Sequence, residues 1–201
     1  MTSDVQQKEM TALHALRFFD DIPPCSPLES RAMRFAIRAH AGQKRKGSER
    51  PYIVHPKAVS KILRAELGGN ATPSMLAGAW LHDVVEDTAA TLADILDEFG
   101  MVVARYVDCC TKAEDTKKTL ARLAAAPAGA KLIKCADIID NLKDIEYFGV
   151  ARAEKYASEK ATQLSAMVVL DTALGYKALH EVGRVFNWCD LKRKEVPCPP
   201  K

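Results

Sequence analysis

The apolar residues of this chain recur at helical spacing, in segments separated by short stretches rich in proline, glycine and threonine. Ser26 is followed by proline and, three residues on, by glutamate, a pattern typical of a helix start. Beyond it, Met33 and Ile37 fall on one helical face, and Thr72-Pro73 marks a second start of the same kind. No stretch of useful length alternates apolar and polar residues as a half-buried strand does. The pattern therefore predicts an all-α fold.

The stretches rich in proline, glycine and threonine also predict where each helix lies and how the chain is organised. Helices are expected over residues 5–19, 27–40, 56–67, 74–85, 91–99, 102–110, 115–125, 130–145, 151–174 and 176–188. A chain of 201 residues fits one domain with a sizeable core. We place that domain at 28–190, after an N-terminal helix and proline-containing linker at 1–27 and before a flexible basic tail at 191–201.

Composition and charge exclude several classes of protein. The net charge of +3 is mild, whereas a duplex-binding protein normally presents a strongly basic face. No apolar run approaches the ~20 residues that span a bilayer, and the polar N-terminus has no hydrophobic signal region. We therefore expect a cytoplasmic protein that binds neither nucleic acid nor membrane. The six cysteines include no Cys-x-x-Cys pair, which favours reduced, mostly buried thiols.

The most informative chemistry follows the almost wholly apolar stretch 75–81. His82 and Asp83 are adjacent there, and Glu86 and Asp87 each follow one of them by four residues. On a helix, residues four apart share a face. An isolated His-Asp pair is usually solvated or hydrogen-bonded, but four ionisable residues at the end of a buried helix are costly unless they are paired or bind a metal. This segment therefore indicates a metal site with two carboxylates beside it.

One helical turn cannot saturate a metal ion, and His55 and Asp137 are the candidates for the remaining ligands. His55 alone is a weak signal, because His-Pro is common in a loop before a helix. Asp137 lies among apolar residues, so it is either a ligand or a buried capping group. Imidazole with carboxylate suits Mn, Fe, Zn or Ni, and two histidines with two aspartates leave positions open for water and a phosphoryl oxygen. Glu86 and Asp87 could then orient the water or move its proton.

With these residues in view, the chain resembles the HD-domain hydrolases of guanosine tetraphosphate. That family comprises the hydrolase domains of the Rel/SpoT enzymes and the stand-alone small alarmone hydrolases. The likeness runs from about Arg31 to Lys143 and on through the segment from Glu154 to Leu170. The stretches that carry it, in the family's order, are Ala39–Lys46, Pro51–Pro56, Leu81–Thr88, Val107-Asp108 with Thr111-Lys112, and Lys134–Asp137 with Asn141-Leu142.

The resemblance implies an all-helical, metal-dependent enzyme of the guanosine-3′,5′-bis(diphosphate) 3′-diphosphatase class. The implied reaction is hydrolysis of the 3′-pyrophosphate of (p)ppGpp to GDP or GTP and pyrophosphate. The metal would be Mn²⁺, with Zn²⁺ or Fe²⁺ as alternatives. The residues that match the family's metal ligands are His55, His82, Asp83 and Asp137. Glu86 and Asp87 match the acidic pair that positions and activates the attacking water.

The nucleotide pocket is also implied by the resemblance. The residues that match it are Arg45, Lys46, Lys112 and Asn141. Tyr52 either packs in the core or contacts the substrate. Two residues depart from the family pattern: Ile138 stands where a basic residue is usual, and Cys109 replaces a glycine. The basic loop also appears one residue longer before His55, which leaves open whether Lys44, Arg45 or Lys46 reaches the ligand.

Two other functions compete with this interpretation. A related HD phosphohydrolase could act on another nucleotide, such as ppApp, NADPH or a deoxynucleotide, because the metal residues do not read the base. A non-catalytic nucleotide-sensing domain is less favoured, because such relatives would be expected to lose a ligand or the acidic pair. The stretch after Leu170 is too short for a synthetase domain, so we expect a hydrolase-only chain. A homodimer is among the alternatives, since the N-terminal helix could either cover the core or mediate dimerisation.

Overall fold

The computed structural model describes residues 25–169 and 172–195, and this part of the chain is all-α. The predicted fold class is therefore confirmed. Within these ranges no strand is formed, and Lys44 and Pro51 form an isolated antiparallel β-bridge. The expected helix 5–19 lies outside the described residues. No helix in the described part of the chain is both long and apolar enough to cross a bilayer.

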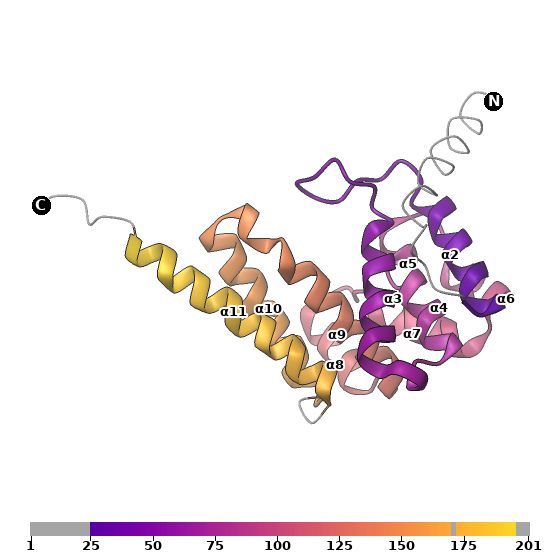
Figure 1. Ribbon diagram of the computed structural model, residues 1–201. Coiled ribbons are helices and arrows are strands. Elements are labelled where there is room, and N and C mark those ends of the chain that lie inside the picture. Colours follow the sequence, from indigo (N-terminus) through magenta and orange to yellow (C-terminus); the bar gives the residue numbers. More distant parts are fainter. Residues whose placement is uncertain (1–24, 170–171, 196–201) are drawn as a thin grey trace, which may run out of the picture.

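The helices follow one another with short connections (Figure 1). Their bounds are α2 Pro27–Ala39, α3 Val54–Leu67, α4 Pro73–Leu81, α5 Val84–Asp87, α6 Leu92–Phe99, α7 Met101–Cys110, α8 Thr116–Ala124, α9 Ala128–Lys143, α10 Val150–Met167 and α11 Ala173–Glu195. Two short 3₁₀ helices, η1 Gly68–Asn70 and η2 Ile145–Phe148, follow α3 and α9.

The predicted helix starts are confirmed where a polar cap precedes proline or an acidic residue. The Ser26 hydroxyl accepts a hydrogen bond from the Glu29 N–H at 3.2 Å, and Thr72 accepts one from the Met75 N–H at 3.3 Å. At α6, Thr91 and Asp94 form a reciprocal capping box. These side chains satisfy N–H groups that have no partner inside the helix. Short polar residues at these positions therefore determine where these helices begin.

The helix expected over residues 74–85 is interrupted, and this prediction was wrong. α4 ends at Leu81, and α5 begins only at Val84. The ring Nδ1–H of His82 donates to the Ala79 carbonyl at 2.8 Å, so a side chain uses an acceptor that a continuing helix would offer to the Asp83 N–H. Asp83, at φ −103° and ψ −4°, is the residue that directly precedes α5. Glu86 and Asp87 therefore lie on a separate short helix.

The C-terminal boundaries also differ from the expected ones. The helix expected over 151–174 ends at Met167, where Val168 adopts the left-handed conformation at φ 51°. α11 then runs to Glu195, beyond the expected end at 188, so residues 191–195 of the expected tail are helical. Arg193 pairs with Glu154 of α10, which joins this last part of α11 to α10, and with Asp190 on α11 itself. Residues 196–201 lie outside the described part.

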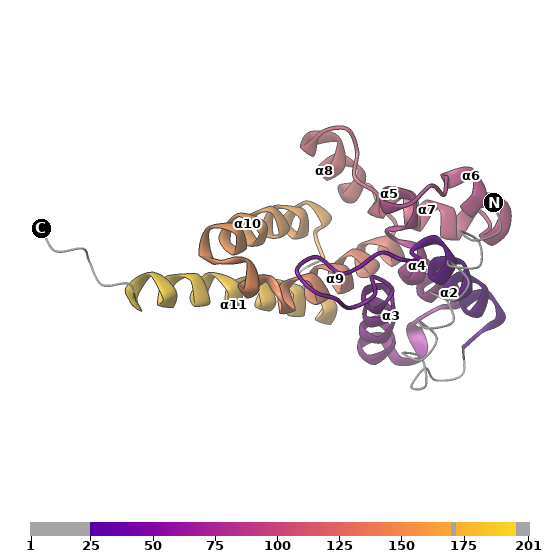
Figure 2. The ribbon, with the colours of Figure 1, turned by 90° about the horizontal axis from the view of Figure 1, so that it is seen from above.

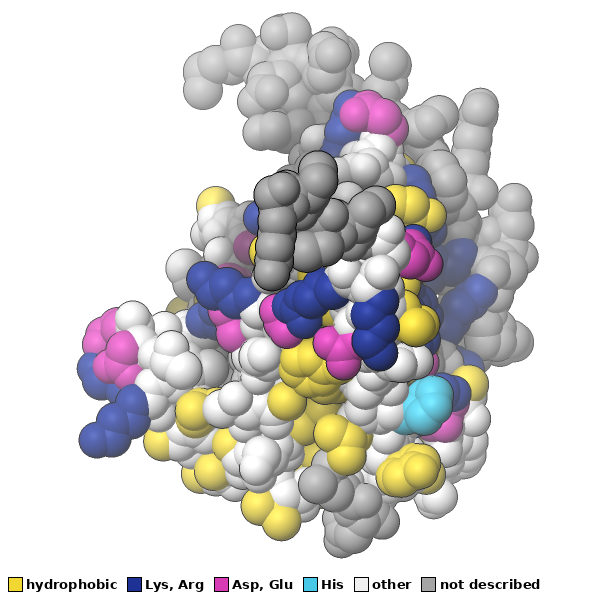
Figure 3. Space-filling model, turned by 90° about the vertical axis from the view of Figure 1, so that its left-hand side faces the viewer, with side chains coloured by type: hydrophobic (Ala, Val, Ile, Leu, Met, Phe, Trp, Pro, Cys, Tyr) yellow, Lys and Arg dark blue, Asp and Glu magenta, His cyan; other side chains and the backbone are white. Residues whose placement is uncertain are grey.

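The buried apolar side chains form two main clusters that meet at α4. The larger cluster joins α3 and α4 to α9, α10 and α11, and the second joins α2 and α4 to α6 and α7. Every residue of α4 from Met75 to Leu81 is buried. Helices α10 and α11 lie side by side and extend away from α2 and α6 (Figures 1 and 2). At the outer end of this pair, basic and acidic side chains lie next to one another (Figure 3). Because α4 belongs to both apolar clusters, its C-terminal end lies at the centre of the molecule.

Candidate functional site

Four ionisable side chains from three separate segments meet inside the protein. His55 lies in the first turn of α3, His82 and Asp83 lie at the break after α4, and Asp137 lies in the middle of α9. One ligand atom of each lies within 4.8 Å of all the others. His55, His82 and Asp137 are almost completely buried, and Asp83 is half-buried. The structure therefore brings together all four residues that the sequence singled out as metal ligands.

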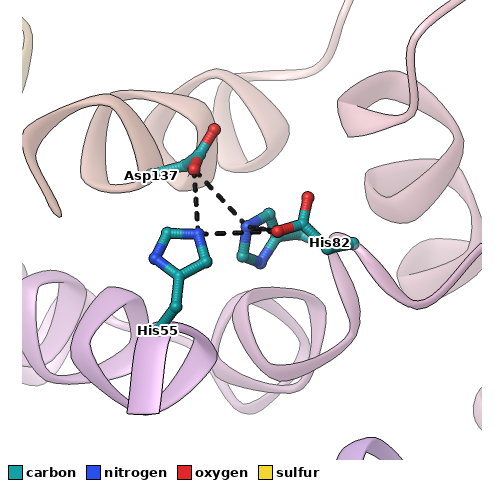
Figure 4. Close-up of side chains that lie close together, drawn as sticks. His55, His82 and Asp137 are labelled. Carbon is teal, nitrogen blue, oxygen red and sulfur yellow. Dashed lines mark hydrogen bonds and ion pairs between the residues drawn. The ribbon is translucent and has the colours of Figure 1, made fainter. Parts of the chain in front are cut away.

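Both histidines turn the same ring nitrogen toward the same two carboxylates (Figure 4). Nε2 of His55 lies 3.1 Å from Oδ1 of Asp137 and 3.5 Å from Oδ2 of Asp83. Nε2 of His82 lies 3.1 Å from Oδ2 of Asp83 and 3.6 Å from Oδ1 of Asp137. Two nitrogen and two oxygen atoms thus face one common point.

The other ring nitrogens are already used, which fixes what the inward nitrogens can do. His82 donates its Nδ1–H to the Ala79 carbonyl, and Nδ1 of His55 lies 2.7 Å from Oδ2 of Asp140. In the neutral rings Nε2 then carries a lone pair. Within the described part of the chain, Nε2 of His82 is buried without a hydrogen-bond partner. Lone pairs facing carboxylate oxygens repel unless a cation lies between them, so the donor set fits a divalent transition-metal ion.

The electrostatics of the cluster lead to the same conclusion. Burial alone would lower the pKa of both rings, but the carboxylates raise it to about 9 for His55 and to about 10 for His82. Burial would likewise raise the pKa of Asp83 and Asp137, yet the histidines, together with Lys134 beside Asp137, hold both well below their usual range. This point therefore attracts positive charge, supplied either by protons or by a metal ion.

The acidic pair lies on α5, next to the cluster. The Lys112 ammonium lies 2.8 Å from Oε1 of Glu86, and the Lys112 N–H donates to Oε2 at 3.0 Å. Asp87 accepts a hydrogen bond from the Tyr52 hydroxyl at 3.0 Å, and the same hydroxyl lies 2.6 Å from Asp83. Burial and the Asp83 charge raise the pKa of Tyr52 far above neutral, so its hydroxyl stays a donor. Lys112 and Tyr52, both expected at the substrate, contact these carboxylates.

A cavity of about 440 Å³ lies next to α9 at Asn141, between the basic loop 42–50 and the segment that joins α9 to α10. Its basic and aromatic lining residues are Arg45, Lys46, Arg50, Arg152, Tyr147, Phe148 and Tyr156. Asn141 also lines it, while its amide nitrogen donates to Asp137. Clustered arginines suit an anionic ligand, and the aromatic rings suit a planar base. The Asn141 side chain therefore links the cavity to the cluster of His55, His82, Asp83 and Asp137, because it lines the cavity and hydrogen-bonds to Asp137.

The basic loop is held in place by packing. Gly47 lies against the Phe148 ring at φ +74°, and a Cβ atom there would approach the ring to 2.9 Å. The Arg152 guanidinium covers the same ring at 4.4 Å. Among the residues predicted from sequence, Arg45 and Lys46 are brought to the cavity by this loop, while Lys44 pairs with Glu49.

Several residues of the site escaped the sequence analysis. Lys134 lies 2.8 Å from Oδ2 of Asp137 and is itself buried, and Asp140 contacts His55. Arg152 and Tyr156 lie four residues apart on α10 and share a face. That spacing was visible in the sequence, but only the packing of α10 against α9 shows that this face meets the cavity.

The two departures from the family pattern lie inside the protein. Ile138 is completely buried in the larger apolar cluster, so its side chain removes no charge from the cavity. Cys109 and Cys110 form the buried last turn of α7, which continues through the position where a glycine was expected. Ile138 is also not among the residues that line the cavity.

Comparisons with known proteins were made on the sequence and on the fold. The HD domain family matches residues 32–166. The GTP pyrophosphokinase of Streptomyces coelicolor is 41% identical over 140 residues, which cover 64% of this chain but only 16% of that protein. Human guanosine-3′,5′-bis(diphosphate) 3′-pyrophosphohydrolase MESH1 is 40% identical over 121 residues, covering 57% of this chain and 67% of the relative.

A solved structure extends the similarity to three dimensions. It is that of a metazoan ortholog of SpoT that hydrolyzes ppGpp and plays a role in starvation responses. The two share 26% sequence identity at a TM-score of 0.69. The superposition covers 83% of this chain and 98% of the other.

Proposed function

This chain belongs to the HD domain family, and we propose that it is a metal-dependent enzyme that hydrolyses the 3′-pyrophosphate of (p)ppGpp. The products are GDP or GTP and pyrophosphate. The observation that carries the proposal is the connection between the buried ligand cluster and the basic cavity through Asn141. Relatives named for this reaction match the chain at about 40% identity, which supports the same substrate.

We assign the four clustered residues to one divalent ion, for which Mn²⁺ is our first candidate and Zn²⁺ or Fe²⁺ the alternatives. His55, His82, Asp83 and Asp137 would hold this ion, since a nitrogen or carboxylate oxygen of each faces the others. When bound, the ion would supply a Lewis acid for the phosphoryl group and the attacking water. Lys134 lies 2.8 Å from Oδ2 of Asp137 and balances part of the charge of this carboxylate.

The acidic pair on α5 handles the water and its proton. Hydrolysis forms a bond from the water oxygen to the phosphorus next to the ribose and breaks the bond from that phosphorus to the 3′-oxygen. The water loses one proton, and the departing 3′-oxygen gains one. Glu86 and Asp87 are the carboxylates placed to take the first proton and return one to the leaving group. Lys112 orients Glu86, and Tyr52 orients Asp87 together with Asp83.

The cavity provides the recognition that the metal ligands lack. Lys46, Arg50 and Arg152 offer positive charge to a substrate with two diphosphate groups. Tyr147 and Tyr156 offer aromatic rings to the base, because the Phe148 ring already packs against Gly47 and Arg152. The cavity volume of about 440 Å³ lies in the range of small-molecule sites.

The test is hydrolysis of ppGpp by metal-stripped protein with and without added Mn²⁺, with products resolved by anion exchange. The His82→Ala variant serves as the control for the site. GDP and pyrophosphate should appear only with the metal and with His82 intact. Rapid turnover of ppApp, NADPH or a deoxynucleotide alongside inert ppGpp would assign the site to a different substrate.

A further inference from the structure

Arg45 and Lys46 are neighbours on the basic loop, but their surroundings differ. Nη1 and Nη2 of Arg45 each lie 3.1 Å from Oδ1 of Asn141, and Nη2 also lies 3.7 Å from Oδ2 of Asp140. The Arg45 side chain is only 18% exposed. Lys46 is exposed, and it forms no hydrogen bond or ion pair with any residue in the described part of the chain. Arg45 therefore contacts neighbouring side chains, whereas Lys46 is exposed, although both residues line the cavity.

Each partner of Arg45 holds a different member of the ligand cluster. Asn141 donates its amide N–H to Oδ1 of Asp137. Asp140 accepts a hydrogen bond from Nδ1 of His55 at 2.7 Å. Arg45 and Asn141 lie 96 positions apart in the sequence, so the fold brings them together. One guanidinium thus reaches two ligands along two separate paths, one through hydrogen bonds to Asn141 and one through the ion pair with Asp140.

Both paths restrict how a ligand can point. An amide has an accepting end and a donating end, and because Arg45 occupies the oxygen of Asn141, the nitrogen faces Asp137. A flipped amide would place N–H against the guanidinium and oxygen against the carboxylate. On the second path, the ionised Asp140 accepts only, so the proton of the neutral His55 ring stays on Nδ1 and Nε2 keeps its lone pair. Arg45 lies beside this carboxylate and favours its charged form.

We propose that Arg45 is a positioning residue for the metal ligands His55 and Asp137, acting through Asp140 and Asn141, and that Lys46 is the loop cation left for the substrate. This inference rests on the proposed metal site but not on the identity of the nucleotide. It separates two residues that the sequence assigned to the same role. Since His82 is oriented by a backbone carbonyl, His55 and Asp137 are the ligands that depend on side chains of the cavity.

The sign of one measurement separates positioning from charge alone. A guanidinium that merely lies near the ion repels it, so removing the charge would tighten metal binding. A guanidinium that orients two ligands stabilises the site, so removing it would weaken metal binding. Arg45→Lys sharpens the distinction, because lysine keeps the charge but loses the planar fork that contacts Asn141 and Asp140.

The experiment is a titration of metal-stripped protein with Mn²⁺ by calorimetry, with no nucleotide present. Wild type is compared with Arg45→Gln, Arg45→Lys and the matched control Lys46→Gln. We expect both Arg45 variants to bind Mn²⁺ roughly 10- to 100-fold more weakly, the usual scale for losing a residue that orients a ligand. The Lys46 variant should bind Mn²⁺ no more weakly than wild type.

Three results decide the matter. Mn²⁺ binding as tight as in wild type in either Arg45 variant would overturn the inference. Equal weakening in the Lys46 variant would also overturn it, since the effect would then belong to the loop as a whole. If Arg45→Gln does not fold, Asn141→Ala and Asp140→Asn remove one path each, and each must weaken Mn²⁺ binding. Failure to hydrolyse ppGpp with Mn²⁺ binding intact would count against the proposed substrate and leave this inference standing.

Discussion

The hydroxyl of Tyr52 lies 2.6 Å from Oδ2 of Asp83, a member of the ligand cluster, and 3.0 Å from Oδ2 of Asp87. A phenol has a single hydrogen to donate, so it is shared between a ligand and a member of the acidic pair. The ring also packs against His40, with centroids 4.6 Å apart. Tyr52 therefore supports two carboxylates, Asp83 and Asp87, whereas one interpretation of the sequence had placed it against the substrate.

Removing this hydroxyl should slow turnover more than it weakens substrate binding. Tyr52→Phe keeps the ring and its packing but leaves Asp83 and Asp87 without a donor. A hydrogen bond to a charged group contributes about 1.5–3 kcal/mol, which corresponds to a fall in kcat of roughly 10- to 100-fold. Steady-state kinetics on ppGpp would measure it, with the exposed Tyr176→Phe as control. A raised KM with unchanged kcat would restore the role of Tyr52 as a substrate contact.

Asp83→Ala should abolish turnover and metal retention together. Asp83 lies within 3.5 Å of Nε2 of both His55 and His82, so its loss removes a ligand and leaves two imidazoles facing a space. Metal content after gel filtration, measured by elemental analysis, and ppGpp turnover are the two readouts. A variant that kept full activity would remove Asp83 from the ligand set.

The Glu86→Gln variant should retain the metal but turn over substrate more slowly. Glu86 stands on α5, outside the cluster, and its carboxylate is held by Lys112. Without a group that exchanges protons, turnover should fall by roughly 10²-fold or more. The matched control is Glu49→Gln, which removes an exposed carboxylate paired with Lys44. Loss of the metal from Glu86→Gln would instead make Glu86 a ligand.

Much of this architecture could be predicted from the sequence because its signals are local. Ser26 and Thr72 cap the helices they were expected to cap, since a short side chain satisfies the helix start without help from the rest of the fold. The break at His82 could not be predicted in this way. It depends on the His82 ring taking the Ala79 carbonyl, and nothing in the apolar pattern marks that choice.

The residues of the site also differ in whether they could be predicted from the sequence. His55, His82, Asp83 and Asp137 were identifiable because unusual residue types stood in an apolar context or a specific motif. Asp140, like Arg152 and Tyr156, is ordinary in sequence and gains its role only when helices far apart in the chain pack together. The role of Lys112 was missed for the same reason, because its partner Glu86 lies 26 residues away.

A buried glutamate outside the site should dominate the stability of the N-terminal half. Glu29 is 1% exposed and accepts hydrogen bonds from Ser60, Arg64 and Trp80, which joins α2 to α3 and α4. Glu29→Leu would leave these donors without an acceptor and should cost about 3 kcal/mol or more in the free energy of unfolding. Urea unfolding would measure this.

The comparison for Glu29 is an ion pair near the surface. Glu66→Gln breaks the contact with Lys177, which is half exposed, and should cost less than about 1 kcal/mol. Similar losses in the two variants would mean that burial of Glu29 contributes nothing special. The free energy of unfolding should therefore separate the two glutamates clearly.

Lys160 should make stability depend on pH in the alkaline range. Burial and the nearby Lys134 and Lys112 lower its pKa from 10.5 to about 8, while Asp137 and Glu159 oppose this only in part. Between these values the unfolded chain holds a proton that the folded chain has released, so this residue makes stability rise with pH. Below pH 8 the folded protein bears the full cost of the buried charge.

Lys160→Met should therefore stabilise the protein near pH 7, by up to about 3 kcal/mol, and the gain should shrink as pH rises from 8 to 10.5. Chemical unfolding at several pH values would follow the difference between variant and wild type. The control is Lys155→Met, an exposed lysine on the same helix. A difference that stays constant across this range would show that Lys160 is not the titrating group.

Because α4 is enclosed on every side from Met75 to Leu81, its amide hydrogens can reach water only when both apolar clusters open. We expect them to be among the slowest of the molecule to exchange with deuterium, while the exposed loop 42–50 exchanges quickly. His82 follows this enclosed helix directly, whereas Lys46 belongs to the loop. One side of the site, formed by the end of α4, would then stay in place for as long as the protein is folded. The other side, formed by the loop 42–50, would open and close many times in that period. A substrate would therefore enter past the loop.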